Sequence, residues 1–109
     1  MSDLDQYQQD AVEFIAYDRS IAVDGIALYP VIALSEEVGE MSAKFSKAIR
    51  KDRSVDLEAL KGELGDILWN VAALANEAGM SLSSIAHQNL HKLRSRQQRG
   101  AIRGDGDNR

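Results

Sequence analysis

Two short segments of the chain carry the same pattern of acidic residues, and this pattern could hold a metal ion. The segment Leu34–Met41 aligns position by position with Leu60–Ile67. In each segment an acid precedes an apolar residue, a glycine follows, and a second acid comes next. The acids are Glu37 and Glu40 in the first segment, and Glu63 and Asp66 in the second. Because residues three apart are neighbours on a helix surface, each pair would lie on one side of a helix.

The spacing of the two segments places a turn midway between them. Their midpoint falls within the charged stretch Lys51–Arg53, so two helices joined there would run antiparallel. In that register Glu37 would lie opposite Asp66, and Glu40 opposite Glu63. Four carboxylates would then meet at one level of a helical hairpin.

A cluster of four carboxylates calls for a cation, because like charges at close range repel one another strongly. Ligation by oxygen alone suits Mg²⁺ or Mn²⁺ rather than zinc. We therefore expect Mg²⁺ as the cofactor, with Mn²⁺ able to substitute. The alternative is that the acids form the solvated face of two amphipathic helices. Two copies of the pattern in matched register favour the metal site.

The elements that must position these acids are helices. Helical periodicity covers almost the whole chain, and no segment shows convincing strand alternation. Residues 18–29 lose that periodicity and contain Gly25, so we predict a loop there. The predicted helices begin near Asp3, Pro30, Ser54 and Ser81, and the third ends at Gly79. We predict an all-α, four-helix bundle whose antiparallel helical hairpin carries the acidic site.

Length and composition set the bounds for everything else. A chain of 109 residues, 44% apolar and 28% charged, suits one globular domain. We assign this domain to residues 1–99, followed by a Gly/Asp-rich tail over residues 100–109. The net charge of −4 argues against nucleic acid as a partner, and no apolar run is long enough to cross a membrane. The absence of cysteine excludes disulfides and thiolate metal sites and fits a cytoplasmic protein.

The third predicted helix also indicates assembly. Its segment Ile67–Ala75 is apolar almost all the way round, which means burial on more than one side. A partner chain would supply the missing cover, most simply through two-fold symmetry. We therefore expect a homodimer or homotetramer that completes the bundle, with active sites formed at the interface.

The acidic segments also resemble the signature of a known family. Glu36-Glu37-x-x-Glu40 followed by Glu63-x-x-Asp66 is similar to the motif of the MazG-like, all-α nucleoside triphosphate pyrophosphohydrolases. The similarity extends over most of the chain, through Leu28–Pro30, Lys61–Trp69, Asn89–Leu93 and Gly100–Arg109. The paired acidic motif is fairly specific to this superfamily but says little about the base.

What this resemblance implies is a hydrolase that acts on phosphoric anhydrides. Water would attack the α-phosphorus of a nucleoside triphosphate and pyrophosphate would leave, in an oligomer of at least two chains. The resemblance makes Glu37, Glu40, Glu63 and Asp66 the magnesium ligands. Glu36 would be a further acid that binds metal or positions the attacking water, so Glu36 and Glu37 are the candidate catalytic residues. The expected role is house-cleaning of the nucleotide pool.

Several polar residues are candidates for binding the rest of such a substrate, because a triphosphate needs cations and donors at its far end. They are Lys44, Asn70, Asn89, Lys92 and Arg96. The last three follow three-and-four spacing on the fourth predicted helix, where its apolar stripe turns polar; an ordinary solvated helix end would look the same. Lys44 lies one turn beyond Glu40 and could pair with it or reach a phosphate. Asn70, one turn after Asp66, could read a base edge.

Two other functions fit the same pattern of acids. One is phosphoribosyl-ATP pyrophosphatase, a relative within the same superfamily that performs the same chemistry. The other is a non-catalytic helical dimerisation or regulatory module whose acids are merely solvated. Binding of a divalent metal would separate this module from the two enzymes.

Overall fold

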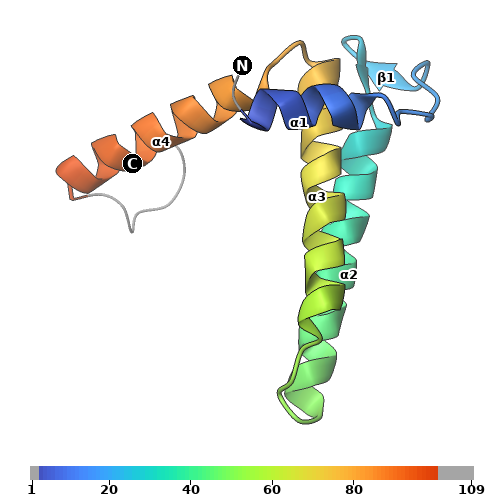
Figure 1. Ribbon diagram of the computed structural model, residues 1–109, viewed down its shortest axis with the longest axis vertical. Helices are drawn as coiled ribbons and strands as arrows, with labels where there is room; N and C mark the ends of the chain where they lie inside the picture. The colour runs from blue at the N-terminus through green and yellow to red at the C-terminus, as the bar shows by residue number, and fades with distance from the viewer. Residues whose placement is uncertain (1–2, 101–109) are drawn as a thin grey trace.

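The computed structural model describes residues 3–100, and within them the fold is almost entirely helical (Figure 1). Four helices and one two-stranded sheet occur in this range: α1 (Asp3–Val12), β1 (Ala22–Val23), β2 (Ile26–Ala27), α2 (Tyr29–Arg50), α3 (Leu57–Glu77) and α4 (Leu82–Gln98). The predicted all-α class is therefore confirmed. Of the expected tail over residues 100–109, only Gly100 lies within the described residues. None of the described helices is both long and apolar enough to cross a membrane.

α2 and α3 form a long antiparallel hairpin that makes up the main body of the molecule (Figure 1). Pro30 lies in the first turn of α2, where its missing N–H breaks no helical hydrogen bond. α3 begins later than predicted, because Asp56 rather than Ser54 caps it. The Asp56 carboxylate accepts hydrogen bonds from the backbone N–H groups of Glu58 and Ala59, at 3.0 and 3.3 Å. The hairpin turns in the predicted charged stretch, so the two acidic segments lie on neighbouring antiparallel helices.

A small β-hairpin occupies part of the segment that the sequence predicts as a loop. β1 and β2 pair antiparallel, and each contains only two residues. Asp24 and Gly25, which join them, both have positive φ values of 51° and 76°. A two-residue turn of this kind matches the twist of the strands, and Asp-Gly is a typical sequence for it. That dipeptide is the available signal, because strands of two residues are too short to show alternation.

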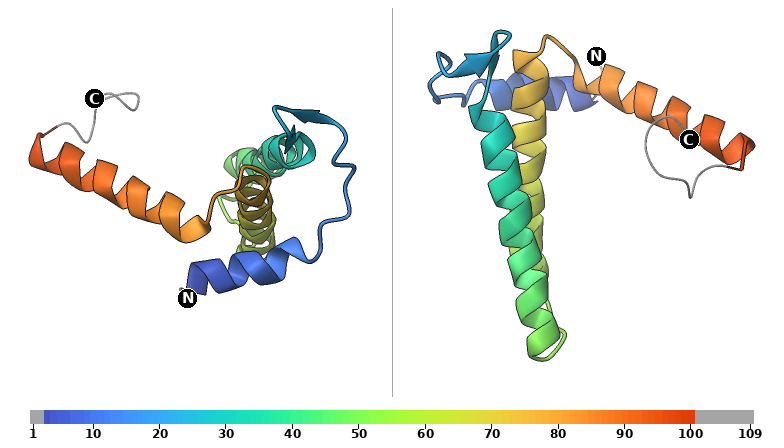
Figure 2. Two further views of the ribbon diagram at one scale, coloured as in Figure 1. Left: turned by 90° about the horizontal axis from the view of Figure 1, so that it is seen from above. Right: turned by 180° about the vertical axis from the view of Figure 1, so that it is seen from behind.

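α1 crosses the open end of the hairpin and packs against α3 (Figure 2). Gln8 is buried in this contact, where it donates to the carbonyl of Met80 at 3.0 Å and accepts from the N–H of Leu82 at 3.0 Å. The indole N–H of Trp69 on α3 donates to the carbonyl of Ala11 at 3.0 Å. The buried core at this junction consists of Ala11, Ala72, Ala75 and Leu82. Small side chains let the helices approach closely, and α1 thereby fixes the upper part of α3.

α4 leaves the hairpin at an angle instead of packing alongside it (Figure 1). α3 ends as predicted at Gly79, which takes the left-handed φ of +72°. Ser81 caps α4, also as predicted. Asp5 of α1 then holds the start of α4, accepting from the N–H and the hydroxyl of Ser83 at 3.1 and 2.7 Å. Among the helices described in residues 3–100, only α2 and α3 run alongside each other, so closure of a bundle by these helices would need a second chain.

A stripe of exposed apolar side chains runs along one side of the hairpin. On α2 and α3 this apolar stripe comprises Val31, Val38, Phe45, Ile49, Leu57, Leu64 and Leu68, which are 41–74% exposed. Steps of four and seven residues keep its members on one side of each helix, and this is not the side that carries the paired acids. The segment Ile67–Ala75, by contrast, is covered in large part by α1 of the same chain. The exposed apolar stripe therefore shares only Leu68 with the predicted segment and extends along both helices of the hairpin.

We expect the full chain to form a dimer or a larger assembly at micromolar concentration, because a second copy packed on the apolar stripe would remove it from water. Sedimentation equilibrium measures this directly. Leu64→Glu should shift the mass toward the monomer, whereas Leu4→Glu, an exposed position on α1 outside the stripe, should leave it unchanged. A wild-type chain that sediments as a stable monomer of 12.0 kDa would contradict this expectation.

Candidate active site

The hairpin brings three of the four predicted metal ligands together. Glu37 on α2 meets Glu63 and Asp66 on α3, and one carboxylate oxygen of each lies within 4.8 Å of the other two. Glu63 is buried, Glu37 is half-buried and Asp66 is exposed, so this acidic cluster is open on one side. Glu37 and Asp66 thus lie across from each other, in the register that the repeated segments predict.

Lys44 lies beside Glu63, next to Glu40, which the register also places there. Its amino group donates to Oε1 of Glu63 at 2.9 Å. Glu40, one turn earlier on α2, is exposed and is not a member of the acidic cluster. It stays close enough for its charge to raise the pKa of Glu37. Glu40 therefore lies at the rim of the cluster, where it is near enough to Glu63 to lower its pKa through a side-chain hydrogen bond.

The crowding of carboxylates shifts their pKa values. The pKa of Glu37 is raised to about 7, first because a hydrogen bond with Glu63 favours the protonated form, and then because of burial and the charges of Glu40 and Asp66. The pKa of Glu63 is lowered, chiefly by the hydrogen bond from Lys44. Without a cation, the cluster therefore tends to keep a proton on Glu37 up to neutral pH.

Two oxygens of the cluster have no hydrogen-bond partner among the described residues. They are Oε2 of Glu37 and Oε2 of Glu63, and both are shielded from solvent. A buried carboxylate oxygen without a partner is costly, and a divalent cation would satisfy both atoms at once. Acids on a helix surface are common without any ion, but these oxygens converge and are buried. The residues present therefore fit a divalent cation held by oxygen ligands.

Asn70 connects the acidic cluster to a shallow pocket. Its side chain is 4% exposed, and its Nδ2 donates to the backbone carbonyl of Asp66 at 2.9 Å. Its Oδ1 is buried without a partner in the described part of the chain. The pocket has a volume of about 200 Å³ and is lined by Tyr29, Ala33, Glu37, Asp66, Trp69 and Asn70. Asn70 therefore retains one acceptor for a ligand beside the acids.

An aromatic pocket adjoins this shallow one. It has a volume of about 370 Å³ and is lined by Phe14, Ala16, Tyr17, Tyr29 and Trp69. Tyr29 and Trp69 line both pockets. Tyr17 stacks on Tyr29 with ring centroids 5.1 Å apart and meets Trp69 edge-on at 6.4 Å. Aromatic faces this close to an acidic cluster would suit a ligand that combines a flat ring with an anionic group, provided that a divalent cation is bound at the acids.

The contribution of Tyr29 and Tyr17 was missed by sequence reasoning. For Tyr29 a signal exists, because the four-residue steps from Tyr29 to Ala33 to Glu37 place it near the acids on α2. Tyr17 has no such signal, since it lies in the irregular segment after α1. Its position comes from a contact that is distant in sequence: its hydroxyl donates to Glu77 at 2.7 Å.

Besides Glu40, Lys44 and Asn70, four further predicted site residues lie outside the acidic cluster. Glu36 is exposed on α2, next to Glu37. Asn89, Lys92 and Arg96 lie on α4, and none of them lines the two pockets beside the acids. The reason is the direction of α4, which diverges from the hairpin within one chain (Figure 2). A substrate-binding role for these three residues stays a prediction.

Comparison with known proteins agrees with this geometry. Residues 30–100 match the family model described as the MazG nucleotide pyrophosphohydrolase domain. The chain is also similar to the Gene 37 protein of Mycobacterium phage L5, with 42% identity over 92 residues that cover 81% of this chain and 80% of that protein. No solved structure matches the chain. The matched region spans the acidic cluster, the rest of the hairpin and α4, and the chain therefore belongs to the MazG family of nucleotide pyrophosphohydrolases.

Proposed function

We propose that this protein hydrolyses nucleoside triphosphates to the monophosphate and pyrophosphate, with Mg²⁺ as its cofactor. The observation that carries this proposal is the convergence of Glu37, Glu63 and Asp66 beside an aromatic pocket. Family membership supplies the reaction class. The aromatic pocket and the acidic cluster follow each other along the hairpin, and this arrangement supports an orientation with the base in the pocket and the phosphates at the acids.

The aromatic pocket suits the nucleobase. Stacking on aromatic rings such as Tyr29 and Trp69 favours any base, because every base has a flat face. The unpartnered Oδ1 of Asn70 could accept a hydrogen bond from an N–H group of the base. We therefore place the base between the two pockets. The α-phosphate then lies at the acidic cluster, whose Asp66 is one turn before Asn70 on α3.

The cation would be held by Glu37, Glu63 and Asp66, with Glu40 at the rim able to complete the set. When bound, Mg²⁺ supplies positive charge that offsets the carboxylates and the α-phosphate oxygens and so favours attack on phosphorus. Mn²⁺ prefers the same oxygen ligands and should substitute. The acids on their own would repel the phosphates, so we expect triphosphate binding to require a divalent cation.

We assign to Glu36 the role of accepting a proton from the attacking water. It is exposed beside the acidic cluster without belonging to it, so its carboxylate is not used in holding the cation. Glu37, the other candidate catalytic residue, would serve first as a ligand. As the bond from water oxygen to the α-phosphorus forms, the bond to the bridging oxygen breaks, and its electron pair leaves with pyrophosphate.

The proposed setting is the nucleotide pool of the cytoplasm. Recognition of a base mainly by stacking is tolerant of base identity, and such tolerance suits an enzyme that removes unwanted nucleotides. We propose that residues 1–99 act as one domain in this role.

Hydrolysis in ¹⁸O-labelled water tests the position of attack. With Mg²⁺ we expect pyrophosphate release, with the label in the nucleoside monophosphate, because the acids would hold the α-phosphate. Orthophosphate together with a nucleoside diphosphate would refute this mechanism, and label in pyrophosphate would place the attack at the β-phosphorus. Phosphoribosyl-ATP belongs in the substrate panel, since exclusive turnover of that compound would replace the proposed substrate class.

The variant Glu63→Gln tests the assignment of the metal ligands, because it removes one charge and keeps the shape of the side chain. We expect this variant to lose metal-dependent activity while its helical circular dichroism persists. Glu58→Gln is the matched control, an exposed acid in the first turn of the same helix, and should keep full activity. Undiminished turnover by Glu63→Gln would remove this residue from the site.

The variant Glu37→Gln tests two roles of this residue: its effect on the stability of the metal-free chain, and its role as a metal ligand. The pKa of Glu37 is raised from 4.5 to about 7 in the folded chain. The stability due to its protonated form is therefore complete below pH 4.5 and lost as the pH rises through about 7. Without metal, we expect Glu37→Gln to melt at a higher temperature than the wild type at about pH 8 and at the same temperature near pH 4. Thermal melts should also show a smaller rise on adding Mg²⁺ in the variant, and an equal rise would contradict its role as a ligand.

A further inference from the structure

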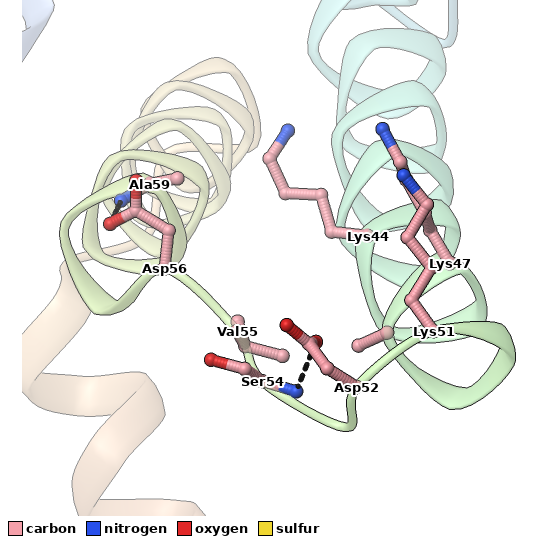
Figure 3. Close-up of a pocket in the computed structure, with 9 residues that line it drawn as sticks. Lys44, Lys47, Lys51, Asp52, Ser54, Val55, Asp56 and Ala59 are labelled. Carbon is pink, nitrogen blue, oxygen red and sulfur yellow. Dashed lines mark hydrogen bonds between the residues drawn. The ribbon is translucent and has the colours of Figure 1, made fainter.

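A pocket at the tip of the hairpin, beyond the acidic cluster, is bordered by three lysines (Figure 3). Lys44 and Lys47 come from α2, and Lys51 is the residue that caps its end. The pocket has a volume of about 210 Å³, or roughly seven times the share of one water molecule in the liquid. In Figure 3 the lysine side chains rise along one side of the pocket, and Asp56 and Ala59 at the start of α3 lie across from them. A chain with a net charge of −4 thus carries a local concentration of cations.

These lysines continue the line of residues that forms the acidic cluster. Steps of three and four residues along α2 connect Tyr29, Ala33, Glu37, Glu40, Lys44, Lys47 and Lys51. Such steps keep side chains on one side of a helix. One side of the hairpin therefore presents aromatic, then acidic, then basic groups, in that order from its open end to its tip.

The charges around this lysine pocket leave it suited to an anion. Its two acids are engaged with the backbone: Asp52 accepts from the N–H of Ser54 at 3.0 Å, and Asp56 caps α3. The side chains of Lys47 and Lys51 make no hydrogen bond or ion pair with any other residue in the range 3–100. Two ammonium groups are therefore available to a ligand, next to a third that contacts the acidic cluster.

We propose that the lysine pocket holds the distal phosphates of the triphosphate and then the pyrophosphate that leaves. This inference rests on the proposed function, because it takes the α-phosphate to lie at the acids. With a rise of 1.5 Å per residue, Lys44 lies about 6 Å and Lys47 about 10 Å beyond Glu40 along α2. The flexible lysine side chains can reach back over part of that distance to the β- and γ-phosphates. Lys51, about 16 Å beyond Glu40, is placed to attract pyrophosphate outward after cleavage.

The position of Lys44 also matches the charge that develops in the reaction. When the bond from the α-phosphorus to the bridging oxygen breaks, the electron pair stays on that oxygen, and the departing pyrophosphate becomes more negative. The amino group of Lys44 lies at the edge of the cluster, 2.9 Å from Glu63. A fixed positive charge there stabilises the leaving group, while Lys47 holds the outer phosphate. Lys44 thus reaches a phosphate, which is one of the two roles that the sequence allows for it. Lys47 and Lys51 are additional phosphate-binding residues.

Calorimetric titration of the full chain with tripolyphosphate and Mg²⁺ tests this inference, because tripolyphosphate has neither base nor sugar. Lys47→Gln should weaken its binding roughly tenfold, as expected for one charged hydrogen bond. Lys51→Gln should weaken it by a smaller factor. Lys61→Gln is the matched control, an exposed lysine on the far side of α3 from Ala59, and should bind as the wild type does. Nucleoside monophosphates should bind equally well to the wild type and all three variants.

Two results would overturn the inference: tripolyphosphate that binds Lys47→Gln as tightly as the wild type, or an equal loss of tripolyphosphate and monophosphate binding. Kinetics give a second measurement, since product inhibition by pyrophosphate should weaken in Lys47→Gln while inhibition by the monophosphate stays the same. Failure of the proposed function has a different signature. Lysine-dependent binding of tripolyphosphate without release of pyrophosphate from any triphosphate would refute the hydrolysis and keep the lysine pocket.

Discussion

The mutual repulsion of Glu37, Glu63 and Asp66 is the constraint on which the rest of the molecule depends. Their oxygens lie within 4.8 Å of one another, and burial of two oxygens without partners adds to the cost. Two long helices can hold this arrangement because the backbone of each is fixed on both sides of the acids, and because Lys44 offsets part of the charge. A chain in this state gains stability from any cation that binds there, so metal binding and folding are coupled.

The aromatic end of the hairpin depends on contacts that also anchor α1. The indole of Trp69 donates to the carbonyl of Ala11, so the ring that borders both pockets is held by the first helix. Burial and the hydrogen bond to Glu77 raise the pKa of Tyr17 to about 12, which keeps its hydroxyl protonated as a donor. Two of the rings that line the surface proposed for the base are therefore held by hydrogen bonds to other parts of the chain.

The two sides of the hairpin carry different kinds of side chain. One side carries the apolar stripe, which calls for a second chain; the other carries the line of aromatic, acidic and basic groups. Because these sides are distinct, an assembly through the apolar stripe would leave the aromatic, acidic and basic groups on the other side open to a substrate. Under the proposed function, a cation at the acids and three lysines on the same side would let a small acidic protein bind an anionic nucleotide despite its net charge of −4.

The acids, the turn between them and the helix that each belongs to follow from the sequence by itself, because helical periodicity and the midpoint of a repeat are local properties. Tertiary structure decided the full set of groups that contact Glu63. Periodicity places Glu40 and Lys44 on the same side of α2, and in the packed chain Glu63 contacts Lys44 at 2.9 Å as well as Glu40. The direction of α4 was likewise decided by contacts such as Asp5 with Ser83, which join the two ends of the chain. A pattern of apolar residues tells which side of a helix is buried, but only the packed chain determines what covers it.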